Sequence, residues 1–398
     1  MDSKLLGSIL LIVGTSIGAG MLALPIATAQ LGFVGSLILL VSCWFVMTAG
    51  AFLILEVNLW LPQNSNLISM AKATIGPFGQ IIAWLSYLLL LYSLLCAYIA
   101  GGSDLFHNLL AKAGLTLSPS VSAIIFTLLF GLVVYLGVRS VDYVNRGLMF
   151  VKLGAYVLLV ILLAPFIETT KLAAGEMKYI LSATAITVTI TSFGYAAIIP
   201  SLRIYFAGDI KRLKQAVFIG SLVPLVCYIF WDMVIMGVIP LDGSQGLISI
   251  LQSKTSTSDL VNTMSATVSS ESVSFFTKLF TSICVVTSFL GVSLCLTDFL
   301  ADGLQMENKG GRRIFIQALV FFPPLLIVLF YPNIFIQALQ YAGIYCIVLL
   351  ILLPAWMAWH GRYTRRIASG FTVPGGKLFL AILMAISVAI IAQSLLAM

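Results

Sequence analysis

Residues 14–25 read GTSIGAGMLALP. This stretch lies inside an apolar run that begins at Leu5, and it places three glycines, a threonine, a serine and a proline within that run. Each glycine costs a helix interior about 1 kcal/mol relative to alanine. The stretch therefore predicts a first membrane helix that is interrupted along its length.

The composition is that of an integral membrane protein. Of 398 residues, 61% are hydrophobic and only 9% are charged, whereas soluble proteins carry about 25% charged residues. A spanning helix needs about 20 apolar residues, and runs of that length favour helices over the shorter strands of a barrel. The sequence predicts eleven spans: about 5–28, 33–57, 79–104, 120–138, 144–166, 180–205, 215–239, 275–299, 314–331, 334–358 and 376–397.

The lysines and arginines predict the orientation. With a cytoplasmic N-terminus, 15 of them fall in inner loops and 5 in outer loops, and Lys152 lies within a span. The positive-inside rule then places the N-terminus in the cytoplasm and the C-terminus in the periplasm. The same bias accounts for the net charge of +7, so no nucleic-acid partner is expected.

Two further features are interpreted as structural. The longest loop, about 241–274, is rich in serine and threonine, and a flexible connector is favoured over a lid. The six cysteines lie in spans without a CxxC pattern, so we interpret them as buried apolar residues. No metal or cofactor is expected.

A second disturbed stretch, residues 191–200 (TSFGYAAIIP), begins in the sixth span. Five spans separate it from the first, so two five-span units would have opposite orientations in the membrane. Paired interruptions at corresponding positions indicate a transporter binding site, because unwound backbone persists only where it lines a cavity. The alternative is helix packing, since Gly14 and Gly18 form a small-xxx-small pattern.

The first interruption offers groups for both charges of an amino acid. The N–H groups near Gly18, Ala19 and Gly20 lie at a helix start, which favours an anion. The carbonyls near Ile12 and Val13 are expected to end the preceding helix and to accept from an ammonium. A zwitterionic amino acid is therefore the predicted substrate.

The chain resembles the hydroxy/aromatic amino acid permease family along its whole length. The resemblance rests on GTSIGAGMLALP, on residues 192–220 (SFGYAAIIPSLRIYFAGDIKRLKQAVFIG), and on residues 97–106 (AYIAGGSDLF), 287–304 (TSFLGVSLCLTDFLADGL), 321–332 (FFPPLLIVLFYP) and 341–345 (YAGIY).

The resemblance implies an all-α, LeuT-like 5+5 inverted-repeat fold in one domain, with repeats at 5–167 and 180–359 and an extra helix at 376–397. It also implies proton-coupled uptake of an aromatic amino acid, with tyrosine expected, across the bacterial inner membrane. Tryptophan, phenylalanine or a small hydroxy amino acid, and coupling to sodium, remain alternatives.

The resemblance also implies a site formed by spans 1 and 6 and completed by spans 3, 8 and 10. The residues expected to hold the charged ends of the substrate are Thr15, Ser16, Gly18, Ala19 and Gly20. Those expected to line the side-chain pocket are Ser192, Phe193, Gly194 and Tyr195, together with Tyr98 in span 3.

Lys152 is the first candidate for handling the coupling ion, because ionisable residues within spans are functional candidates. In some proton-coupled relatives a span 5 lysine takes the place of sodium, and Thr287 and Ser288 match the span 8 hydroxyls around that place. The alternative is that Lys152 snorkels to the membrane surface. Asp232, alone in the apolar span 7, is the second candidate.

Glu56, Asp104 and Asp298 lie at span ends and are interpreted as interface or gate residues.

Other classes of protein find little support in the sequence. A membrane enzyme is disfavoured because His107 and His360 are the only histidines and no catalytic motif is present. A channel is disfavoured because no filter motif or ring of charge is evident.

Overall fold

The computed structural model describes residues 3–206, 209–306, 310–332 and 334–397, and within these ranges every regular element is helical. Ten of the described helical segments are long and apolar enough to cross a membrane, and a bent pair near the N-terminus brings the number to as many as eleven. The prediction of an all-helical membrane protein is confirmed.

The first part of the chain, up to residue 206, forms six long helical runs that are joined by short helices and turns. Its elements are α1 (Ser3–Ser16), α2 (Ala19–Ala27), η1 (Ala29–Leu31), α3 (Gly32–Leu59), α4 (Leu67–Thr74), α5 (Pro77–Lys112), α6 (Pro119–Leu136), α7 (Val138–Leu163), η2 (Ala164–Phe166), α8 (Thr169–Leu172), η3 (Met177–Leu181), α9 (Ala183–Ser192), η4 (Gly194–Ile198) and α10 (Ile199–Tyr205).

The second part begins with a long helix after the gap at residues 207–208. Its elements are α11 (Ile210–Val238), α12 (Leu247–Gln252), α13 (Ser256–Val268), α14 (Glu271–Gly303), α15 (Gly310–Phe330), α16 (Phe335–Ile347), η5 (Val348–Leu352), α17 (Leu353–Trp359), η6 (His360–Thr364) and α18 (Gly376–Leu396).

Local sequence signals set several of these starts. Pro77 and Pro119 occupy the first turns of α5 and α6, where a missing N–H costs nothing. Asn66 and Ser69 form a reciprocal capping box at α4, and the Asp209 carboxylate accepts from the Arg212 N–H at the start of α11.

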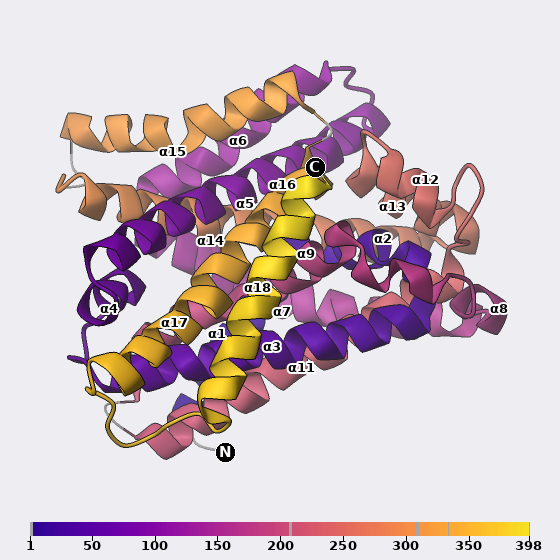
Figure 1. Ribbon diagram of the computed structural model, residues 1–398. Coiled ribbons are helices and arrows are strands. Elements are labelled where there is room, and N and C mark those ends of the chain that lie inside the picture. The colour runs from indigo at the N-terminus through magenta and orange to yellow at the C-terminus, as the bar shows by residue number, and fades with distance from the viewer. Residues whose placement is uncertain (1–2, 207–208, 307–309, 333, 398) are drawn as a thin grey trace.

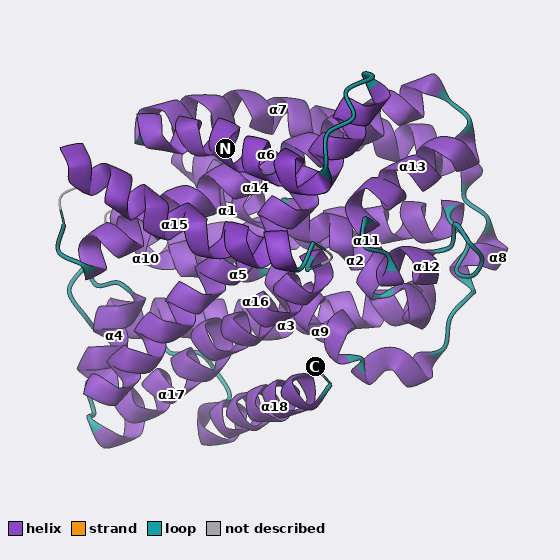
Figure 2. Ribbon diagram, turned by 90° about the horizontal axis from the view of Figure 1, so that it is seen from above, coloured by secondary structure: helices purple, strands orange, loops and turns teal. Residues whose placement is uncertain are grey.

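The spans differ in how deeply they are buried, and the difference separates an inner group from an outer one. In an apolar 18-residue stretch of the α9–α10 run, 78% of the stretch is buried, whereas only 22% of the corresponding stretch of α18 is buried. Helix α9 packs against α2 and α16, and α16 also packs against α5. Seen from above, α18 lies at the edge of the bundle (Figure 2). Helices α2, α9 and α16 therefore belong to the buried inner group.

The loop at 241–274 is largely helical, so the expectation of a flexible connector is wrong. It contains α12 and α13, which lie with α8 at one end of the bundle, opposite α4 (Figure 1). The Asp104 carboxylate on α5 accepts from the Ser258 N–H at 2.8 Å and from its hydroxyl at 2.7 Å. Asp104 thus serves as an N-cap supplied by another helix, which fixes α13 on α5.

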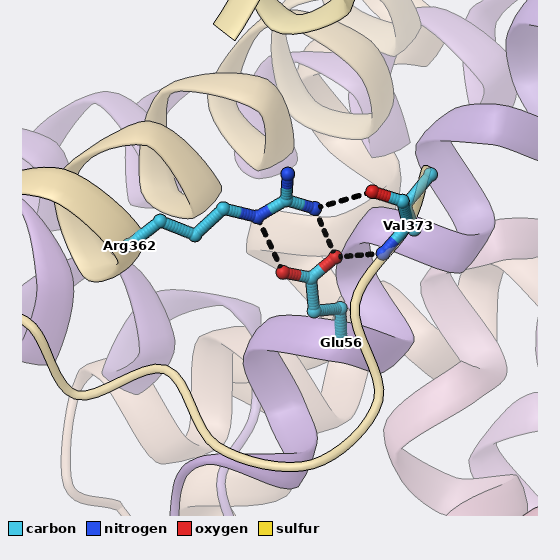
Figure 3. Close-up of polar contacts among 3 residues, drawn as sticks. All are labelled: Glu56, Arg362 and Val373. Carbon is cyan, nitrogen blue, oxygen red and sulfur yellow. Dashed lines mark hydrogen bonds and ion pairs between the residues drawn. The ribbon is translucent and has the colours of Figure 1, made fainter. Parts of the chain in front are cut away.

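The connection between η6 and α18 is tied to α3 by a buried ion pair. The Glu56 carboxylate, which is fully buried, accepts from Arg362 Nε at 2.7 Å and from Arg362 Nη2 at 2.5 Å (Figure 3). It also accepts from the Val373 N–H at 2.7 Å, and Arg362 donates to the Val373 carbonyl. This bidentate arrangement joins two segments that are far apart in sequence.

Candidate functional site

The first apolar run is divided at Ile17 and Gly18 into α1 and α2, which are bent by 54°. Gly18 is extended (φ −148°, ψ −155°), and the Ile17 N–H still donates to the Val13 carbonyl at 2.8 Å. Helix α1 therefore continues to Ser16, about one turn beyond the expected end. The prediction that the carbonyls near Ile12 and Val13 are the free ones is wrong, because the helix itself uses the Val13 carbonyl.

The sixth apolar run changes its hydrogen bonding at the second disturbed stretch. Helix α9 ends at Ser192, the 3₁₀ turn η4 covers Gly194–Ile198, and α10 resumes at Ile199. The Phe193 N–H donates to the Ile190 carbonyl, in the tighter pattern of a 3₁₀ turn. A 3₁₀ stretch within a helical run often marks a functional hinge.

The two disturbed stretches meet. A Cβ built on Gly20 of α2 would lie 3.3 Å from the Ser192 hydroxyl of α9. The Tyr228 hydroxyl on α11 lies 2.6 Å from the Ser16 carbonyl oxygen and 2.8 Å from the Ser192 carbonyl oxygen. Its single proton can serve one of these carbonyls at a time, so one buried side chain joins the ends of α1 and α9.

Tyr228 is not among the site residues expected from the sequence. A signal for it was present, because Tyr228 precedes Asp232 by four residues and so shares its helix face within an apolar span. A buried hydroxyl on that face needs a hydrogen-bond acceptor, and the backbone carbonyls of Ser16 and Ser192 are the acceptors.

Lys152 reaches the first interruption from α7. Its side chain is 1% exposed, and its ammonium nitrogen lies 2.5 Å from the Ile17 carbonyl oxygen. The alternative that Lys152 snorkels to the membrane surface is therefore wrong. The buried Cys284 thiol on α14 lies near it.

Helix α14 contributes Ser288 to the same place. The Ala19 N–H donates to the Ser288 hydroxyl oxygen at 2.9 Å, and a Cβ on Gly18 would collide with that oxygen. Gly18 is therefore required for this close approach. Tyr98 of α5 also lies beside Ser288. The neighbouring Thr287 hydroxyl instead donates to the Ile283 carbonyl of its own helix at 2.8 Å.

The two hydroxyls before the break differ in their bonding. The exposed Thr15 side chain donates to the Ile12 carbonyl at 2.8 Å, within its own helix. The buried Ser16 hydroxyl has no hydrogen-bond partner among the described residues. A buried polar atom without a partner is costly unless a ligand or water completes it. The Ser16 hydroxyl thus has an unused donor and acceptor at the break.

The aromatic residues of the second stretch are fully buried. The Phe193 ring packs edge-on against Tyr228 with centroids 5.1 Å apart, and the Tyr195 hydroxyl lies 3.1 Å from the Thr48 hydroxyl on α3. Gly194 leaves its Cβ position 3.6 Å from the Cys346 sulfur of α16. These contacts bring α3, α11 and α16 against the turn η4.

Asp232 belongs to a different cluster. It is fully buried, and it accepts from the Ser36 hydroxyl on α3 at 2.5 Å. The Ser36 hydroxyl also lies 3.1 Å from that of Thr28, which follows α2. The other Asp232 oxygen has no partner among the described residues. Asp232 thus links α11 to the α2–α3 connection, whereas Lys152 contacts the break itself.

Comparison of the sequence with known proteins shows its family. The model of the tryptophan/tyrosine permease family matches residues 1–394. A "Tyrosine-specific transport system 1" of Haemophilus influenzae is 35% identical over 389 residues, covering 98% of this chain and 96% of the relative.

Two further relatives carry other substrate names. A "Tryptophan-specific transport protein" of Haemophilus influenzae is 32% identical, covering 94% of this chain and 91% of the relative. A "Glutamine transporter 2" of Aliivibrio fischeri is also 32% identical, covering 96% of this chain and 97% of the relative. Identity at this level therefore accompanies more than one substrate.

Proposed function

Because the chain belongs to the tryptophan/tyrosine permease family, we propose that it is an aromatic amino acid permease that takes up L-tyrosine together with a proton. The family is one of permeases, so the prediction that the chain is not an enzyme is confirmed. Tyrosine is favoured by the relative named for tyrosine transport, which is 35% identical to this chain.

The proposed architecture is the LeuT-like fold, with α1–α2 and α9–η4–α10 as its broken helices 1 and 6. Two interrupted runs that lie five spans apart and meet at Gly20 and Ser192 support this proposal. The repeats would cover 5–167 and 180–359, and α18 would lie outside them. The loop charges support a cytoplasmic N-terminus and a periplasmic C-terminus. The bacterial transport relatives support a place in the inner membrane.

The substrate is proposed to bind where α1 ends and α2 begins. The positive end of the α2 dipole faces the break and favours a carboxylate there, while the Ala19 N–H is bonded to the Ser288 hydroxyl. The Ser16 hydroxyl, buried without a partner, supports a ligand at this point and is the single observation that carries the assignment. Tyr98, Phe193, Gly194 and Tyr195 would surround the aromatic ring.

Lys152 is proposed to carry the coupling proton. Its ammonium bonds to the Ile17 carbonyl within the break, which is where a sodium ion would otherwise need oxygen ligands. Ser288 lies at the same break through Ala19, whereas Thr287 bonds to its own helix. In this scheme the proton and the amino acid bind from the periplasm, the broken helices tilt, and Lys152 releases its proton inward.

Uptake into proteoliposomes tests the proposal. We expect radiolabelled tyrosine to accumulate under an imposed inward proton gradient without sodium, and unlabelled tyrosine to compete better than tryptophan or glutamine. Accumulation that needs a sodium gradient would reject proton coupling. Stronger competition by tryptophan or glutamine would reject tyrosine as the principal substrate while leaving the permease assignment intact.

A further inference from the structure

A groove of about 820 Å³ opens between α3, α11 and the chain that enters α18. Its walls include Trp44, Phe45 and Phe52 of α3 and Phe218 and Ile219 of α11. Phe45 is 58% exposed and Phe218 is 47% exposed, on helices that are long and apolar enough to span the membrane. The groove is therefore cut into a lipid-facing surface of the bundle.

Positive charge gathers at one end of this groove. Lys211 and Lys214, in the first turns of α11, are both lining residues. The Lys214 ammonium lies 4.7 Å from the centroid of the Phe371 ring, which also lines the groove, so its charge lies on the groove wall. The nearby Asp209 carboxylate is paired with Arg212 at 3.2 Å, so its charge is already compensated.

The start of α18 adds to this positive end. Gly375 lines the groove with a positive φ of 105°, and α18 begins after it without a side-chain cap. No side chain of the described residues caps the first N–H groups of this 21-residue helix, whose N-cap lines the same groove as the two lysines. Uncapped N–H groups at a helix start attract phosphate. Two lysines and a helix start thus favour an anion at the same end.

The floor of the groove is held in place. Val373 is bonded to the buried pair of Glu56 and Arg362 (Figure 3), and the Phe371 ring packs edge-on against Phe52 with centroids 6.3 Å apart. Both residues lie in the connection that closes the groove from the α18 side. The shape is therefore fixed by bonds between α3 and this connection.

We propose that this groove binds one anionic phospholipid, with its acyl chains along the aromatic walls and its phosphate at Lys211, Lys214 and the start of α18. Apolar walls open to the bilayer match acyl chains, and the cationic end at the terminus of a spanning helix matches a headgroup at the membrane surface. A zwitterionic amino acid would leave its own ammonium beside two lysines. The proposal is independent of the transported substrate.

Trp44 provides a reporter within the groove. The full chain would be reconstituted in phosphatidylcholine vesicles that contain increasing fractions of brominated phosphatidylglycerol or brominated phosphatidylcholine, whose bromines quench tryptophan. The quenching that the wild type shows and Trp44→Phe does not is the part that arises in the groove. We expect half-quenching at a brominated phosphatidylglycerol fraction about 25-fold lower than that of brominated phosphatidylcholine, since each of the two surface lysines contributes about fivefold.

Charge variants test the assignment of the lysines. The double variant Lys211→Gln/Lys214→Gln should bring this ratio close to one, whereas Lys211→Arg/Lys214→Arg should retain it. Lys72→Gln/Arg312→Gln removes the same charge from exposed positions outside the groove and should also retain it. Equal quenching by the two lipids, or an equal loss of selectivity in the Lys72/Arg312 variant, would overturn the proposal.

Discussion

The ammonium nitrogen of Lys152 lies 2.5 Å from the carbonyl oxygen of Ile17, at the point where the first membrane run is divided. A hydrogen bond from a charged donor is roughly twice as strong as one between neutral groups. Loss of the Lys152 proton therefore weakens the contact that fixes the end of α1. In the proposed transporter, the protonation of one side chain and the position of one broken helix are coupled through this bond.

Replacement of Lys152 by Met tests that coupling. The variant keeps a side chain of similar length but cannot hold a proton or donate to Ile17. We expect proton-gradient-driven accumulation of tyrosine to fall at least tenfold, while exchange of internal for external tyrosine continues. Uptake and exchange would be measured in the same proteoliposomes.

The matched control is Lys72→Met, an exposed lysine at the end of α4, which should leave both activities unchanged. Full accumulation by Lys152→Met would show that the coupling proton lies elsewhere. Asp232 would then be the next residue to replace, because its second carboxyl oxygen has no partner among the described residues.

Tyr228→Phe removes the hydroxyl that lies between the Ser16 and Ser192 carbonyls. The change removes the one proton that these two buried carbonyls share, and a buried acceptor left unpaired costs about 1–3 kcal/mol. We expect a lower midpoint of thermal unfolding and a several-fold lower rate of uptake. Tyrosine binding and uptake would be compared with the midpoint in one detergent.

Tyr156→Phe is the control for this change. It removes a hydroxyl that donates to the Cys227 carbonyl at 2.8 Å, close in the bundle but not at a break. It should lower the midpoint without an equal loss of uptake. If the two variants lose uptake in proportion to their midpoints, Tyr228 has only a structural role.

The residue pattern predicted the helices and both disturbed stretches, because glycine, proline and membrane-length apolar runs have local consequences. It did not predict which carbonyls are free, since the extent of α1 depends on partners from α7 and α11. Tyr228 was missed for the same reason: its partners are 212 and 36 residues away in sequence. The polar loop 241–274 was misjudged because its helices are fixed by Asp104 from another span.

Asp104→Asn tests how α13 is held on α5. An amide keeps one acceptor but loses the charge that caps the first turn of α13, and loss of a cap costs about 1 kcal/mol. We expect faster amide hydrogen exchange in α12 and α13 with little change in α5. Asp259→Asn alters a carboxylate that accepts from Ser253 and Thr255 within the same loop, so it should affect the start of α13 alone. Unchanged exchange in Asp104→Asn would mean that apolar packing fixes α13.

Glu56→Gln tests the buried pair that fixes the connection into α18. Arg362 is 9% exposed, so the variant leaves a buried guanidinium without its counter-charge. Removing one partner of such a pair costs about 3–5 kcal/mol, whereas an exposed pair contributes about 1 kcal/mol or less. We therefore expect a large fall in the midpoint of thermal unfolding, and a small one for Asp142→Asn, whose pair with Arg146 is exposed.

The double variant Glu56→Gln/Arg362→Met separates charge from packing. It removes the uncompensated guanidinium while keeping an unbranched side chain of comparable reach. If the loss of stability arises from a buried unpaired charge, the double variant must unfold at a higher temperature than Glu56→Gln alone. A double variant that is less stable than Glu56→Gln would show instead that the bond from Arg362 to Val373 carries the stabilisation, because Met cannot donate to that carbonyl.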